Sequence, residues 1–184
     1  MCKRNEEIIN YILKLLLKEK EKEYYCHIQF VHLIGLHLTK RFGGDSYTVE
    51  IACLLHDIGR DNEIDGESHP EASLRIATQI LENFGICAEH TKIIKQCIVN
   101  HGMEVTPQYI EEKIVITSDA ASKVVYHEAF MLMCKKTTCS ERAAWGLGYV
   151  EKGFQKILFD EYKLEVQHGY LKLKDTYSKV LERL

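Results

Sequence analysis

Proline is almost absent from this sequence. Pro70 and Pro107 are the only two in 184 residues, and because proline breaks helices, its scarcity favours long ones. β-Hairpin signals, internal repeats and linkers are also missing, and the best candidate strand, residues 113–117, lies inside a helical pattern. We therefore expect one all-α domain over residues 1–184, long enough to bury a sizeable core.

The sequence also lacks an excess of one charge and a long apolar run. Its 24 lysines and arginines nearly balance 27 acidic residues, for a formal net charge of −3, so the charge does not indicate a nucleic acid polymer as partner. No stretch reaches the roughly 20 apolar residues of a membrane-spanning helix, and the N-terminus lacks an apolar signal segment with a cleavage site. We expect no membrane partner.

The seven cysteines contain no Cys-x-x-Cys motif, and their number is odd. Several lie in apolar helical stripes, where reduced thiols are common. This usage argues against a disulfide framework and predicts a cytoplasmic protein. The spacing also matches no zinc ribbon, and no His-Glu-x-x-His motif is present.

Apolar residues recur at helical spacing along almost the whole chain. Gly43-Gly44 ends the second expected helix, Gly59 offers a stop to the third, and Ser68-His69-Pro70-Glu71 is a capping box that begins the fourth. The first five expected helices cover about residues 6–20, 24–41, 46–57, 68–85 and 88–100. A sixth begins near residue 109, and the sequence over 126–184 is also helical in pattern.

A histidine and an aspartate, His56 and Asp57, directly follow the apolar run of residues 51–55. Burying such side chains without a partner is costly. Adjacent helical residues point about 100° apart, so the two reach one centre only from its inner side. The alternative is a helix end at which His56 interacts with the negative end of the helix dipole.

Other residues of metal-ligand type occupy matching positions. His27 and His101 lie on the apolar stripes of their helices, Asp119 stands where a hydrophobic residue is expected, and His69 lies in the first turn of its helix. Imidazoles and carboxylates on facing helices commonly form metal sites, and this ligand set suits iron, manganese, nickel or zinc.

Simpler interpretations exist for these residues. His101 could be a satisfied core histidine, with His90 as a weaker substitute ligand on the same stripe, and Asp119 could be a surface residue paired with Lys123. The histidine of the capping box could merely begin its helix. His32 is no substitute for the first stripe histidine, because it lies about 140° further round the helix.

Together these residues resemble the HD superfamily of metal-dependent phosphohydrolases, whose pattern is a histidine, a His-Asp pair and a distant aspartate. The segment His27-x-x-Phe30-Val31 is similar to the first signature, with Phe30 where the family commonly has arginine. Residues 116–120, Ile-Thr-Ser-Asp-Ala, resemble the closing segment. Residues 69–72 and 99–102, His-Pro-Glu-Ala and Val-Asn-His-Gly, are similar to the insertions of two-metal branches.

The resemblance implies a helical bundle with the metal site in its centre. The site belongs to about residues 24–125, followed by C-terminal helices over 126–184. One or two divalent iron, manganese, nickel or zinc ions are expected as cofactors. The implied ligands are His27, His56, Asp57 and Asp119 for the first ion, and Asp57, His69 and His101 for the second.

The implied activity is hydrolysis of a nucleotide or another small phosphate ester by a metal-activated water. Asp57 and Arg60 are the expected catalytic residues, and Arg60 and Lys123 the expected substrate contacts, because an arginine grips phosphate with two parallel hydrogen bonds. The alternative for Arg60 is a weak surface pair with Asp61 or other loop acids.

Two functions of other classes remain open from the sequence. One is a di-iron oxygenase-like HD protein, and the other is a catalytically silent module that binds a ligand or partner. The chain lacks the Gly-Tyr-Pro segment and doubled histidine of cyclic di-guanylate phosphodiesterases. It is closer in size to small HD proteins, which include dinucleoside tetraphosphate hydrolases.

Overall fold

The computed structural model describes residues 3–19, 22–102 and 105–183. These residues form helices and no strand, which confirms the all-α prediction. No helix among them is long and apolar enough to cross a membrane. The expected end of the first helix, Lys20, lies outside the described residues. The helices are α1 (Lys3–Glu19), α2 (Lys22–Phe42), α3 (Ser46–Leu55), α4 (His69–Asn83), α5 (Ala88–Asn100), α6 (Ile110–Val125), α7 (His127–Leu132), α8 (Cys139–Gln155) and α9 (Asp160–Glu182).

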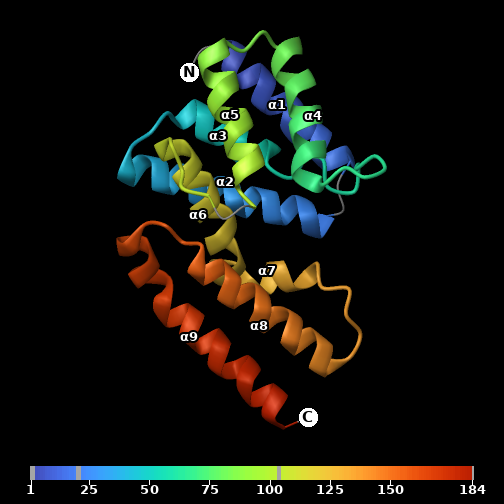
Figure 1. The fold of residues 1–184 in the computed structure, drawn as a ribbon, viewed down its shortest axis with the longest axis vertical. Helices are drawn as coiled ribbons and strands as arrows, with labels where there is room; N and C mark the ends of the chain where they lie inside the picture. The colour runs from blue at the N-terminus through green and yellow to red at the C-terminus, as the bar shows by residue number, and fades with distance from the viewer. Residues whose placement is uncertain (1–2, 20–21, 103–104, 184) are drawn as a thin grey trace.

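The helices form two groups along the long axis of the molecule (Figure 1). α1, α3, α4 and α5 lie at one end, α7, α8 and α9 lie at the other, and α2 and α6 lie between them. α6 packs against α2, α3 and α5 and also against α8 and α9. This helix therefore joins the two groups, and it carries Asp119 at their junction.

Local sequence signals begin several of these helices. The Asp45 carboxylate accepts the backbone N–H of Thr48 at 2.7 Å and caps α3. At the start of α4, Ser68 and Glu71 form the predicted capping box, with Pro70 in the first turn. This capping box fixes His69 as the first residue of α4.

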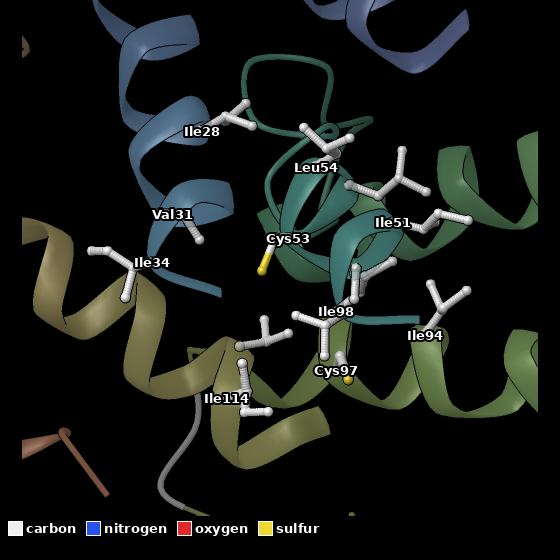
Figure 2. Packing of buried hydrophobic residues seen from close by; sticks show 14 of the residues in the cluster. Ile28, Val31, Ile34, Ile51, Cys53, Leu54, Ile94, Cys97, Ile98 and Ile114 are labelled. Carbon is white, nitrogen blue, oxygen red and sulfur yellow. The ribbon is translucent and has the colours of Figure 1, made fainter. Parts of the chain in front are cut away.

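The core lies where α2, α3, α5 and α6 meet (Figure 2). The apolar stripes expected from the sequence are the buried faces of these helices, and Cys53 and Cys97 are part of them. The six cysteines that the structure describes are all free thiols. The stripes therefore turn the histidines and the aspartate that they carry toward the interior.

The end of α3 differs from the prediction. The helix ends at Leu55 with His56 as its C-cap, so Gly59 is not the helix stop. Instead, Gly59 lies against the first turns of α4, where an added Cβ would be 2.1 Å from the Ser73 nitrogen and 2.3 Å from the Ala72 carbonyl carbon. The missing side chain allows α4 to start directly beside the turn of residues 56–61.

Candidate metal centre

Six side chains that the sequence singles out meet between the two groups of helices. Five are buried, and His69 is half-buried, with 31% of its side chain exposed. They come from five places in the chain: His27 on α2, His56 and Asp57 in the turn after α3, His69 at the start of α4, His101 just after α5, and Asp119 on α6.

Asp57 lies within reach of three imidazoles. Its Oδ2 atom is 3.5 Å from Nε2 of His56. Its Oδ1 atom is 3.4 Å from Nε2 of His101 and 3.6 Å from Nε2 of His69. The two oxygens of this carboxylate therefore face different histidines, which is the arrangement that a bridging ligand needs.

The ligand atoms fall into two overlapping groups. His27, His56 and Asp119 form one, in which Nε2 of His27 lies 3.4 Å from Oδ1 of Asp119, and His56, Asp57 and His101 form the other. All ligand atoms within a group lie within 4.8 Å of one another. The groups share His56, whereas the sequence resemblance implied that the two ions share Asp57.

Backbone carbonyls determine how the two innermost histidines point. Nδ1 of His56 donates to the Cys53 carbonyl at 2.7 Å, and Nδ1 of His101 donates to the Ile98 carbonyl at 2.7 Å. Because a carbonyl only accepts, each Nδ1 carries a proton, and Nε2 of a neutral ring then presents a lone pair to the centre.

The His56 Nε2 atom is buried and has no hydrogen-bond partner within the described residues. An acceptor left in that state costs free energy. A divalent metal ion fits this position, because it would accept the lone pair, and the Asp57 and Asp119 carboxylates would balance its charge.

The electrostatics of the centre keep His56, Asp57 and Asp119 in metal-binding form, whereas at His101 the Asp57 carboxylate outweighs burial and raises the pKa. Burial lowers the pKa of His56 to about 4, in spite of the neighbouring Asp57, so the imidazole is neutral. Burial alone would raise the pKa of Asp57, but His56 and His101 outweigh it and hold that pKa well below its usual range. The pKa of Asp119 is held low in the same way by Lys123 and His27.

Both predicted phosphate-binding cations lie at the rim of the centre. Arg60 donates from Nε to Oδ2 of Asp57 at 3.3 Å, and Nζ of Lys123 lies 2.6 Å from Oδ2 of Asp119. The pair of Asp119 and Lys123 that the surface interpretation required is therefore present. Asp119 is nevertheless buried and faces the histidines, so the pair belongs to the centre.

Tyr24 is a member of the site that the sequence analysis missed. Its hydroxyl donates to Oδ2 of Asp57. It lies three residues before His27 on α2, so helical spacing alone places the two on one face.

The two histidines that were weighed as substitute ligands lie elsewhere. His32 contacts Glu50 at 3.1 Å, and His90 contacts the Thr48 hydroxyl at 2.8 Å.

A cavity of about 630 Å³ lies over the centre. Its floor includes His27, Asp57 and Asp119, and Arg60 and Lys123 also line it. A second wall comes from residues between 130 and 156, in α7, in α8, in the segment between them and at Lys156, which directly follows α8. The volume is in the range of pockets that hold small organic ligands.

Comparison with known proteins extends these observations. The profile of the HD domain matches residues 24–123, more than half of the chain. An HD-superfamily hydrolase from Bacillus thuringiensis has the same fold, with a TM-score of 0.71 and 20% identity over 97% of this chain and 95% of that one. Bacillus subtilis YpgQ, solved in complex with ADP, has a TM-score of 0.71 and 17% identity over 98% of this chain and 94% of YpgQ.

One curated relative is similar to this chain in sequence. Ribonuclease Y of Chloroflexus aurantiacus is 28% identical over 166 residues, which are 85% of this chain and 31% of the ribonuclease. The chain thus spans less than a third of that relative. The HD domain profile begins at Tyr24 and ends at Lys123, and it encloses all six residues of the centre. The chain belongs to the HD domain family.

Proposed function

We propose that this protein is a metal-dependent phosphohydrolase that acts on a nucleotide or a related small phosphate ester. The observation that carries the proposal is the buried, unpartnered Nε2 atom of His56. It lies among three further imidazoles and two carboxylates, and those five groups line an open cavity. Such a cluster is expensive to bury unless a cation holds it together.

The proposed ligands are the residues of the two overlapping groups together with His69, and Asp57, which faces three histidines, is proposed as the shared ligand. His27, His56, Asp57 and Asp119 hold the first ion, and Asp57, His69 and His101 hold the second. When bound, iron, manganese, nickel or zinc ions supply Lewis acidity toward the phosphoryl oxygens and lower the pKa of a coordinated water.

The remaining residues of the site bind and orient. Arg60 lines the cavity beside Asp57, and that carboxylate outweighs the effect of burial and raises the arginine pKa, so the guanidinium stays charged. It directs N–H donors toward the floor of the cavity, where a phosphoryl group would lie. Lys123 supplies a second cation there, and the Tyr24 hydroxyl fixes the orientation of the Asp57 carboxylate.

The relatives support the substrate class. The YpgQ structure contains ADP, a nucleoside diphosphate, and this favours a nucleotide over a sugar phosphate. The similarity to a ribonuclease favours single-stranded RNA as a second candidate substrate. The net charge of −3 argues for the small nucleotide, because an RNA strand is usually attracted by a basic surface.

The test is a substrate panel assayed with the purified, metal-stripped protein. Phosphomonoesters, nucleotides, dinucleoside polyphosphates, cyclic nucleotides and single-stranded RNA are each incubated with manganese, nickel, iron or zinc. We expect metal-dependent hydrolysis of at least one nucleotide, abolished in Asp57→Asn and retained in Asp65→Asn, which changes an exposed aspartate of the nearby loop.

Other results of the panel would overturn the proposal. Oxygen-dependent turnover by a coloured, iron-loaded protein would identify a di-iron oxygenase. Metal binding without turnover of any substrate would identify a catalytically silent binding module.

A further inference from the structure

The wall of the cavity that faces the metal centre is built after the segment that the HD domain profile matches. That profile ends at residue 123, and the wall begins at Phe130 on α7 and continues with Trp145 and Tyr149 on α8. We call these three residues the aromatic wall. Neither the metal centre nor the phosphate-binding cations explain why aromatic side chains line this side.

The three rings pack as one unit. The Phe130 and Trp145 rings are stacked, with centroids 5.0 Å apart and an interplanar angle of 16°. The Tyr149 ring lies 4.6 Å from that of Trp145 and 5.3 Å from that of Phe130. Such mutual packing holds flat, apolar surfaces in fixed positions at the edge of the cavity.

The aromatic wall extends from the metal centre to the solvent. At its inner end, Phe130 is 6% exposed, and its ring lies 6.2 Å from the ring of His27. At its outer end, Tyr149 is 40% exposed. A ligand with a phosphoryl group on the floor would therefore have these rings beside it on the way to the cavity mouth.

Lysines accompany the aromatic wall. Three lysines line the cavity: Lys135, Lys152 and Lys156. The lining also includes two pairs of opposite charge, Arg60–Asp57 and Lys123–Asp119, and one further carboxylate, that of Asp61. Lys156 also donates to the Gly102 carbonyl at 2.7 Å, which ties the end of α8 to the residue after His101. The cavity thus combines a cationic lining with one apolar aromatic side.

We propose that the aromatic wall is the base-binding subsite of a nucleoside polyphosphate whose phosphates lie against the metal centre and the lysines. This inference rests on the proposed function, because that function puts phosphate on the floor. A sugar phosphate or inorganic phosphate offers no flat apolar face to these rings, whereas every nucleobase does. Trp145 and Tyr149 are then residues that determine specificity, and the C-terminal helices complete the substrate site.

The chain provides its own probe, because Trp145 is its only tryptophan. Titration of the unmodified protein with ADP is expected to change the tryptophan fluorescence in a saturable manner. Titration with inorganic pyrophosphate, which has phosphates and no base, is expected to leave it nearly unchanged. A pyrophosphate response as large as that of ADP, or no binding of ADP at all, would overturn the subsite.

A pair of variants separates stacking from general packing. Trp145→Leu keeps an apolar side chain and removes the ring, and it is expected to weaken ADP binding measured by calorimetry by about 5- to 150-fold, the range for loss of one base–aromatic stack. Pyrophosphate binding should change less than about twofold. Phe154→Leu is the matched control, because it breaks a stacked pair with Tyr170 (centroids 3.9 Å apart) that does not line the cavity.

The binding assay and the hydrolysis assay test the subsite and the proposed function separately. If ADP changes the fluorescence of Trp145 but no nucleotide is hydrolysed, the proposed function is wrong and the subsite stands. If nucleotides are hydrolysed while Trp145→Leu and Phe154→Leu bind ADP equally well, the subsite is wrong and the proposed function stands.

Discussion

Gly59→Ala should disrupt the metal centre without touching any of its ligands. The new Cβ would lie 2.1 Å from the backbone nitrogen of Ser73 and 2.3 Å from the carbonyl carbon of Ala72. Both atoms belong to the backbone of α4, so no side-chain rotation relieves the clash. Because ordinary contacts begin at 3.4 Å, α4 must move away by at least about 1 Å.

The cost follows from this displacement. Overpacking of this kind costs about 1–3 kcal/mol, which corresponds to a fall in melting temperature of roughly 2–12 °C for a chain of this length. His69 is the first residue of α4, and its Nε2 atom lies only 3.6 Å from Oδ1 of Asp57. The shift of α4 therefore also separates these two atoms and weakens the second proposed metal position.

Thermal melts and elemental analysis of the purified variant check both effects. Gly148→Ala is the matched control, because an added Cβ there meets nothing within 4 Å in the middle of α8. It should leave the melting temperature unchanged or raise it, since alanine favours a helix over glycine by about 1 kcal/mol. If Gly59→Ala melts with the parent and keeps its full metal content, the close-approach argument is wrong.

Substitutions of three further residues test the rim and the second ion. Arg60→Ala should lower kcat/KM about 10- to 100-fold at full metal content, as expected for a lost hydrogen bond to a charged group. Arg60→Lys should recover part of this loss. Unchanged steady-state kinetics of Arg60→Ala would show that Arg60 does not contact the phosphate. Tyr24→Phe should lower kcat about tenfold at full metal content, because Asp57 loses a donor; parent-like kinetics would make the hydroxyl dispensable. His69→Ala should lose one of two bound ions by elemental analysis, and an unchanged ratio would exclude this residue as a ligand.

Local patterns were sufficient to predict the six helices before residue 126 and the inward position of the stripe residues, whereas α7, α8 and α9 were expected only as helical sequence over 126–184. His27 and Asp119 lie on faces whose other residues are apolar, and burial of a whole face requires burial of each member. The capping box at Ser68 likewise determined where α4 begins. Such features depend on neighbours three or four positions away, and these are visible in a sequence.

Contacts between distant segments were not visible in this way. From the sequence, Gly59 is expected to be a helix stop, because glycine commonly ends helices. The sequence does not reveal that the α4 backbone packs against Gly59. Tyr24 was missed because tyrosine is not a typical ligand, and its role becomes apparent only beside Asp57. Trp145 and Tyr149 form a cavity wall only because α8 folds back over the centre, and no periodicity encodes that approach.

The central claim is that this cluster is a metal centre organised by Asp57, whose carboxylate faces His56, His69 and His101. The most direct test is elemental analysis of the purified parent and of Asp57→Asn, with Asp65→Asn as the exposed control. We predict bound transition metal in the parent and the control, and loss of most of it in Asp57→Asn while its helical circular dichroism is retained. Full metal content in folded Asp57→Asn would contradict the account.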